Sequence, residues 1–222
     1  MATFVLIPGG WHGGWYFQSF AEALRARRHR AHPVTLTGLG DRRHLLNASV
    51  NLDTHIEDVV RVLEDERLTD VVLLGHSYGG MVVSGAVDRA SDRIRAAIHS
   101  DAYVPEDSQS CFELTSDFFR QMFLDGAVGD GFSVPPPTGG DRDPRRTPHP
   151  LASFLQRIRL TKPPPPMPRG YVYLSGWPGS PFAAVYERVR REPQWRTLSL
   201  PVGHNVIGEA FNELLEFVLQ FA

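Results

Sequence analysis

The chain has 222 residues, of which 42% are hydrophobic, and a formal net charge of −2. This length predicts a single domain over residues 1–222, and the near-neutral charge argues against nucleic acid as a partner. The lone cysteine, Cys111, excludes an intramolecular disulfide and a cysteine-based zinc site. With no basic leader and no apolar run of membrane-spanning length, a cytoplasmic protein without a membrane partner is expected.

Short apolar runs alternate with helical patterns along most of the chain. Strands are predicted over residues 3–8, 33–37, 71–76, 95–101, 170–175 and 196–200. Helices are predicted over residues 22–28, 54–64, 81–90, 181–191 and 209–221, with Asp53 and Ser180 as N-caps. This order predicts an α/β fold whose mostly parallel six-stranded sheet is covered by helices on both faces. In such sheets the functional residues lie on loops at the carboxyl ends of the strands.

The alternation is interrupted between residues 106 and 168. This segment has an aromatic amphipathic stretch near 112–123, a polar run over 139–148, proline runs at 135–137 and 163–166, and a helical pattern near 151–160. We interpret it as a small lid insertion whose aromatic face lines a substrate pocket. The alternative is a surface excursion whose aromatic residues only pack on the core.

The third predicted strand leads directly into the sequence Gly75-His76-Ser77-Tyr78-Gly79, and a helical pattern follows. A Gly-x-Ser-x-Gly pattern between a strand and a helix is typical of a nucleophile elbow, a strained turn that exposes the serine. Ser77 is therefore the candidate nucleophile. The backbone N–H of Tyr78, at the start of the helix, is a candidate oxyanion donor.

A serine nucleophile requires a base, and His204 follows the last predicted strand in the sequence Val202-Gly203-His204. We predict that His204 is this base. Two other histidines, His29 and His149, lie in polar segments and are expected at the surface.

The third member of a triad is a carboxylate that orients the histidine. The loop at 176–180, after the fifth predicted strand, contains no carboxylate. One strand earlier, Asp101 lies at the strand tip, and it is the predicted acid. Glu106, Asp107 and a dyad without a carboxylate are the alternatives.

A glycine-rich loop, Gly9-Gly10-Trp11-His12-Gly13-Gly14-Trp15, follows the first predicted strand. Glycines there let the backbone approach a substrate, so the N–H of Gly10 is the second candidate oxyanion donor. Trp11 and His12 are candidate substrate contacts, and so are Trp177 and Phe119. The alternative is that this loop is only a turn and that these side chains pack on the core.

The residues from Phe4 to Trp15, Leu36 to Arg42, Gly75 to Gly80 and Asp101 to Asp107, with Gly203-His204, resemble the α/β-hydrolase superfamily. Within it, the chain is similar to small esterases such as plant methyl salicylate and methyl jasmonate esterases and to plant hydroxynitrile lyases. The resemblance implies Ser77 as nucleophile, His204 as base, and the Gly10 and Tyr78 amides as the oxyanion hole.

The chain also departs from this pattern. The plant enzymes carry an aspartate after the penultimate strand, which is missing here, whereas some superfamily members place their acid one strand earlier, as Asp101 would be. Pro8 stands where relatives commonly have histidine. Gly9 and Asn205 replace the threonine and lysine of hydroxynitrile lyases, which argues against cyanohydrin cleavage.

These observations predict a serine hydrolase that cleaves a small, largely apolar carboxylic ester or lactone through a Ser-His-Asp triad and an acyl-enzyme. No metal or cofactor is implied, and the expected partner is the small-molecule ester; a homodimer is compatible with the sequence. One competing hypothesis is a non-hydrolytic enzyme of the same fold that cleaves C–C bonds, cyclises or lactonises. The other is a receptor-like ligand-binding module.

Overall fold

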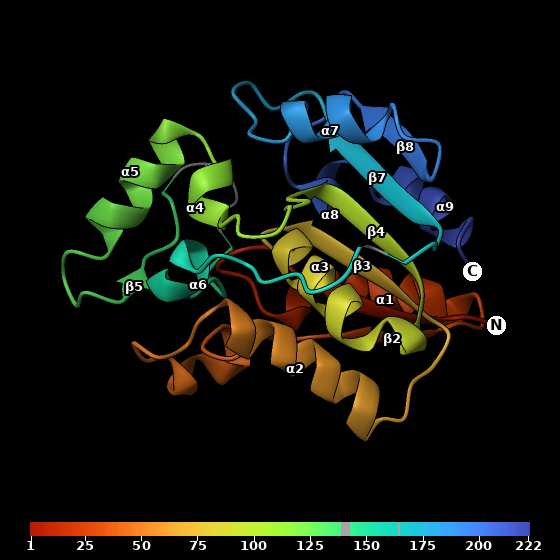
Figure 1. The fold of residues 1–222 in the computed structure, drawn as a ribbon, viewed down its shortest axis with the longest axis horizontal. Coiled ribbons are helices and arrows are strands. Elements are labelled where there is room, and N and C mark those ends of the chain that lie inside the picture. The colour runs from red at the N-terminus through yellow and green to blue at the C-terminus, as the bar shows by residue number, and fades with distance from the viewer. Residues whose placement is uncertain (139–142, 164) are drawn as a thin grey trace.

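The computed structural model describes residues 1–138, 143–163 and 165–222. Within these ranges, six parallel strands form one sheet in the order β2-β1-β3-β4-β7-β8 (Figure 1). The strands are β1 Thr3–Ile7, β2 Arg30–Pro33, β3 Val71–Ser77, β4 Ile94–Ala102, β7 Arg169–Leu174 and β8 Trp195–Leu200. Because all six strands run in the same direction, their carboxyl ends meet at one edge of the sheet.

Helices cover both faces of this sheet, as predicted (Figure 1). Side chains alternate along β1, so that Phe4 and Leu6 belong to one apolar cluster while Val5 and Ile7 belong to another. The first cluster packs under α1 and α9, and the second under α2 and α3. The helices of the sheet layers are α1 Gln18–Ala26, α2 Leu52–Asp65, α3 Gly79–Ala90, α7 Ala183–Val189, α8 Val206–Glu209 and α9 Phe211–Leu219.

The element boundaries differ from the predicted ones at several places. β2 ends at Pro33, whereas a strand over 33–37 was predicted. Proline has no N–H to donate, and the chain turns away after one further hydrogen bond, from Val34 N to Leu6 O at 2.9 Å. α1 begins at Gln18, four residues early, because a 3-10 turn over Gly14–Phe17 leads into it. The last predicted helix is divided at Ala210 into α8 and α9.

Both predicted N-caps were wrong. The cap of α2 is Asn51, whose side chain accepts a hydrogen bond from Thr54 N at 3.1 Å, while Asp53 forms an ion pair with Arg89. Ser180 accepts a hydrogen bond from Phe182 N at 3.2 Å and so shapes the turn before α7, whose N-cap is Phe182 itself. The sequence shows polar residues near the start of each helix. Which of several adjacent residues becomes the N-cap depends on the path of the incoming loop.

Between β4 and β7 the chain leaves the sheet and forms a separate layer, which we call the insertion (residues 106–168). It lies to one side of the sheet, on the left of Figure 1. Its elements are α4 Cys111–Leu114, α5 Asp117–Gly126, β5 Ser133–Val134, β6 His149–Pro150 and α6 Leu151–Leu155. α6 stops well before residue 160, because Gln156 adopts extended backbone and its side chain donates to Asp53 at 2.7 Å. Residues 139–142 of the predicted polar run lie outside the described residues.

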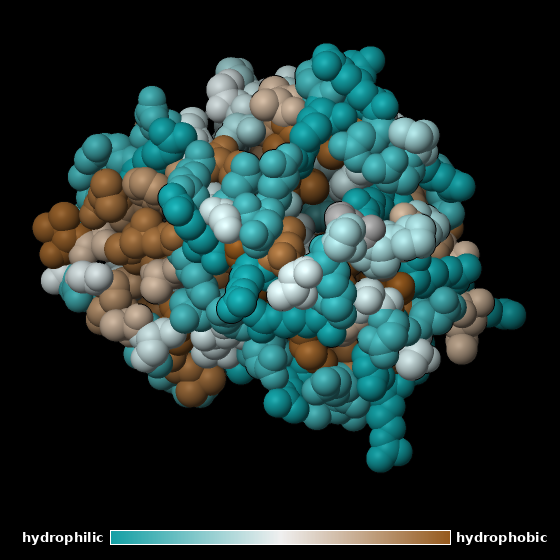
Figure 2. Space-filling model, viewed as in Figure 1, coloured by the Kyte–Doolittle hydropathy of each residue, from teal (hydrophilic) through white to brown (hydrophobic). Residues whose placement is uncertain are grey.

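The outer surface of the insertion is unusually apolar. Figure 2 shows hydrophobic residues gathered at this end of the molecule, and Phe118 and Val128 are 71% and 81% exposed. In the part of the chain that the structure describes, none of the helices has the length and apolar character needed to cross a membrane.

Candidate active site

Ser77 lies on a sharp turn between the end of β3 and the start of α3. Its φ angle of 55° is in the left-handed region, which is strained for a residue with a side chain. Strand and helix approach so closely that a Cβ atom on Gly75 would lie 2.6 Å from Val83 Cγ2, and one on Gly79 would lie 2.6 Å from the carbonyl oxygen of Ile7. The two glycines of the predicted elbow are therefore required by contact with their neighbours.

The loop after β1 runs beside this turn. A Cβ atom on Gly9 would lie 2.9 Å from the Cβ atom of Ser77. Among the described residues, the backbone N–H groups of Gly10 and Tyr78 donate no hydrogen bond to the protein. Two unpaired amides thus flank the serine, one of them at the amino end of α3, where the helix dipole favours negative charge.

His204 and Asp101 meet at the carboxyl edge of the sheet. Nδ1 of His204 donates a hydrogen bond to Oδ2 of Asp101 over 2.6 Å. Asp101 is fully buried at the end of β4, and its other oxygen accepts a hydrogen bond from Leu174 N at 3.2 Å. Like Ser77, Asp101 has a positive φ, 43°. The carboxylate is therefore fixed by the backbone of its own strand and by the end of the neighbouring strand β7.

Burial has opposite effects on the pKa values of this pair. It raises the pKa of the Asp101 carboxyl to about 8 and lowers the pKa of the His204 imidazole to about 3. Both shifts have the same cause: in a site of low dielectric constant, a charge on one group without a charge on the other is unfavourable. Because they share a short hydrogen bond, the two groups titrate as a pair. When Asp101 is ionised, its carboxylate can only accept, so Nδ1 of His204 carries the proton and Nε2 is the acceptor.

The loop that carries His204 is held by two contacts that the sequence analysis did not assign. Nε2 of His76, inside the elbow sequence, donates to the carbonyl oxygen of His204 at 3.0 Å. The Glu209 carboxylate accepts a hydrogen bond from Gly203 N at 2.8 Å. The ring of His76 is also stacked on Tyr16, with centroids 5.1 Å apart. Nothing in the sequence around Glu209 signals its contact.

The alternative acids point elsewhere. Glu106 forms an ion pair with Arg188 at 2.7 Å. Asp107 accepts a hydrogen bond from Leu160 N at 2.8 Å. Of the three carboxylates considered from the sequence, the structure brings only Asp101 to His204.

The predicted substrate contacts fall into two groups. The Trp177 ring lies 4.3 Å from that of His204, and the Phe119 ring, from α5, lies 5.8 Å from that of Trp177, measured between centroids. Trp11 and His12 make contacts within the protein: Nε1 of Trp11 donates to Val134 O at 2.9 Å, and the His12 ring bonds to Gly10 O at 2.6 Å. Aromatic side chains from the insertion and from the loop after β7 thus form a series of ring contacts that reaches His204.

His149 was predicted to lie at the surface, and this was wrong, because the β5-β6 hairpin packs it into the protein with no exposed area. Its Nδ1 accepts a hydrogen bond from Trp11 N at 3.2 Å, and its Nε2 bonds to Ser153 Oγ at 2.8 Å. Since Nδ1 is an acceptor, the proton is on Nε2. Burial holds the pKa of His149 well below its usual value. A neutral histidine of the insertion therefore fixes the residue that follows Gly10.

Matches to known proteins cover nearly the whole chain. Residues 4–215 match the model of the alpha/beta hydrolase family. The chain is 37% identical to a carbendazim hydrolyzing esterase of Nocardioides, with 97% of this chain and 98% of that protein covered. It is 28% identical to methylesterase 10 of Arabidopsis thaliana over 54% of this chain and 44% of that one.

Solved structures share the fold. An extracellular alpha/beta-hydrolase from Paenibacillus, described as homologous to tobacco salicylic acid binding protein 2, superposes with a TM-score of 0.86 at 22% identity, covering 100% of this chain and 99% of that one. A methylesterase, MES16, from Arabidopsis gives a TM-score of 0.72 at 20% identity, covering 99% and 98%.

The fold and the family match define the class: the chain belongs to the alpha/beta hydrolase family. Within that family it is a carboxylic ester hydrolase, and it is similar to the plant methylesterases. Both the fold and this relationship were predicted from the sequence.

Proposed function

We propose that the protein is a serine esterase in which Ser77, His204 and Asp101 form the catalytic triad. The observation that carries this proposal is the 2.6 Å hydrogen bond between His204 Nδ1 and the buried Asp101, two residues 103 positions apart in the chain. It occurs at the same sheet edge as a serine with positive φ on a strand-to-helix turn. This combination supports acyl transfer, because the base has its carboxylate and its ring lies 4.5 Å, between centroids, from that of His76, the residue before Ser77.

In the proposed mechanism, Ser77 Oγ attacks the ester carbonyl while His204 Nε2 accepts the hydroxyl proton. Asp101 holds the ring and stabilises the imidazolium that forms. The tetrahedral oxyanion accepts hydrogen bonds from the N–H groups of Gly10 and Tyr78. Collapse breaks the ester C–O bond, and His204 returns the proton to the leaving alcohol. Water then attacks the acyl-enzyme by the same proton transfers in reverse, which releases the acid and restores Ser77.

The proposed substrates are small, largely apolar esters or lactones, and we propose that the insertion acts as a lid over them. The aromatic side chains of Trp177 and Phe119 beside His204 support this choice. A relative that is 37% identical over nearly the whole chain is a carbendazim hydrolyzing esterase, so carbendazim is the first particular substrate we propose.

The test is mass spectrometry after exposure to a fluorophosphonate, together with turnover of p-nitrophenyl acetate, p-nitrophenyl butyrate and carbendazim. We expect one adduct, on Ser77, and rapid ester turnover. Ser77→Ala is expected to abolish labelling and lower kcat by about 10⁶. Ser84→Ala, on the same helix with its hydroxyl bonded to Gly80 O at 3.0 Å, is the control that keeps both properties.

The alternatives give different results. An adduct on Ser77 with negligible ester turnover would contradict hydrolysis and favour the non-hydrolytic or receptor-like hypotheses. Absence of an adduct would contradict the proposed triad.

A further inference from the structure

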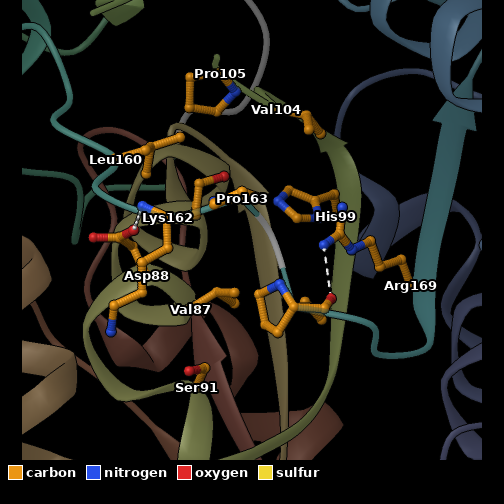
Figure 3. Close-up of a pocket in the computed structure, with 13 residues that line it drawn as sticks. Val87, Asp88, Ser91, His99, Val104, Pro105, Leu160, Lys162, Pro163 and Arg169 are labelled. Carbon is orange, nitrogen blue, oxygen red and sulfur yellow. Dashed lines mark hydrogen bonds between the residues drawn. The ribbon is translucent and has the colours of Figure 1, made fainter. Parts of the chain in front are cut away.

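Away from the candidate active site, a cavity lies between α3, β4 and the segment that returns from the insertion to β7 (Figure 3). Its volume is about 120 Å³. None of the residues that line it belongs to the proposed triad or oxyanion hole. Its polar side chains include Asp88, His99, Lys162 and Arg169. This cavity is therefore distinct from the site of the proposed ester chemistry.

His99 is the buried polar group of this cavity. Its side chain comes from β4, is only 3% exposed, and faces the hollow in Figure 3. Among the described residues, neither ring nitrogen has a hydrogen-bond partner of normal distance and angle, and the backbone of Gly80 is the nearby polar group that acts on the pKa of the ring. Buried polar atoms are nearly always paired, and one that is not costs about 1–3 kcal/mol. A ligand in the cavity would supply the missing partner.

Arg169, at the start of β7, lies beside His99 in the same wall (Figure 3). Its guanidinium donates one hydrogen bond, to Pro165 O at 3.2 Å, and packs over the Trp195 ring at 5.6 Å from the centroid. Arg169 is only partly exposed to solvent and, among the described residues, forms no ion pair within contact distance; the charge of Glu192 offsets only part of the effect of burial on its pKa. Burial accordingly lowers the pKa of Arg169. A desolvated cation with donors to spare favours an anion.

The remaining lining limits which anion fits. Apolar side chains form most of the wall: Val87, Ala97, Val104, Pro105, Leu160, Pro163 and Pro165. Asp88 also faces the hollow, with its carboxylate bonded to Thr161 N and Lys162 N at 2.9 and 3.1 Å. A fixed negative charge there disfavours multiply charged anions such as phosphate. The apolar walls require an organic part. The cavity, at about 120 Å³, is slightly smaller than an apolar cavity of about 150 Å³ that holds benzene, and its lining includes the exposed Lys162 and Pro163, so a ring can extend from it towards solvent.

We propose that this cavity is a binding site for a small organic monocarboxylate. Arg169 and His99 bind the carboxylate, and the valine, leucine and proline side chains enclose the apolar part. This site is independent of the triad and goes beyond the proposed esterase activity.

The test uses benzoate as the probe and benzamide as its neutral match, titrated by calorimetry and by NMR of the histidine ring signals. The enzyme is first inactivated with the fluorophosphonate, so that benzoate cannot occupy the proposed catalytic site. We expect saturable benzoate binding that shifts the His99 signals, and at least tenfold weaker binding of benzamide. Arg169→Met is expected to weaken benzoate binding at least tenfold, while Arg190→Met, at the exposed residue that follows α7, leaves it unchanged.

Three results would overturn the proposal: no saturation by about 50 mM benzoate, equal binding of benzamide, or benzoate binding that survives Arg169→Met. The comparison of benzoate with benzamide needs no variant, so it decides the question even if Arg169→Met does not fold. If the fluorophosphonate does not label Ser77, the esterase proposal fails, and the dependence on Arg169 still tests the cavity.

Discussion

The sheet edge and the insertion both contribute to the candidate active site, but they hold their residues in place by different means. At the sheet edge, Ser77 and Asp101 are positioned by their own backbone, at strained φ angles of 55° and 43° and at the ends of buried strands. In the insertion, Phe119 and His149 are positioned mainly by contacts of their side chains, on elements outside the six-stranded sheet. The difference indicates that changes at the sheet edge should affect kcat directly. Changes in the insertion should affect KM or, through the contact of His149 with Trp11, the position of the Gly10 N–H.

The largest effect that separates the two regions is expected at Asp101. Asp101→Asn keeps the shape of the site but favours the wrong tautomer of His204, so kcat is expected to fall by about 10⁴. Glu106→Gln removes a nearby carboxylate that is paired with Arg188 and is expected to leave kcat within about twofold, since surface ion pairs contribute little. Steady-state kinetics with p-nitrophenyl butyrate measure both. Near-normal turnover by Asp101→Asn would remove Asp101 from the triad.

The pH dependence of the same enzyme sharpens this assignment. Burial raises the pKa of Asp101 to about 8, and the active form is the one in which the pair has lost its shared extra proton. Activity is therefore expected to rise with pH through the neutral range, and Asp101→Asn should lose this rise. A kcat/KM profile between pH 5 and 9 measures it, a range of about two units on either side of neutrality. An unchanged profile in the variant would contradict the pairing.

An intermediate effect on kcat is expected where the insertion contacts the loop that carries Gly10. His149→Leu removes the acceptor of Trp11 N next to Gly10, so we expect kcat to fall by about 10² with KM little changed. His29→Leu is the matched control, because His29 Nδ1 accepts a hydrogen bond from Ala2 N at the same 3.2 Å far from the site. Equal kcat values for the two variants would mean that His149 only packs the insertion.

A smaller effect is expected from the aromatic approach. Phe119→Ala removes the ring that contacts Trp177 and is expected to raise KM for p-nitrophenyl butyrate about tenfold without lowering kcat. Phe118, its neighbour, is 71% exposed, so Phe118→Ala is the control and should leave KM unchanged. If both variants behave alike, the side chain of Phe119 does not contact the substrate.

The smallest effect concerns stability. Burial lowers the pKa of His99 to about 3, so below pH 6.5 the folded protein holds fewer protons than the unfolded chain. The free energy of unfolding therefore decreases as the pH is lowered through that range. His99 contributes about 1.4 kcal/mol per pH unit to this slope. His99→Leu should reduce the slope of the free energy of unfolding against pH by up to that amount. Urea unfolding at several pH values between about 6.5, the ordinary pKa of histidine, and about 5 measures the slope. Equal slopes would mean that His99 is protonated in the folded protein.

The sequence predicted the fold and the members of the candidate triad because those features depend on local patterns. The apolar runs, the glycines around Ser77 and the Gly-His after the last strand each constrain their own neighbourhood. The contacts of His149 and Glu209 could not be predicted in the same way, because their partners, Trp11 N and Gly203 N, are defined by the path of loops. Asp101 was identified by elimination, since the loop after β7 has no carboxylate, and its strained backbone was not foreseen.

The position of Asp101 on β4 has a consequence for how the enzyme can diversify. Because the proposed acid comes from β4, the loop between β7 and α7 contributes Trp177 beside His204 but no member of the proposed triad. In relatives with the acid after the penultimate strand, the same loop must serve chemistry and substrate fit together. Here the proposed acid lies outside this loop, so residues 177–179 form a segment that can be randomised to change substrate preference. Gly176 must be kept, because a Cβ atom there would lie 2.7 Å from the backbone of Val202, in the loop that carries His204.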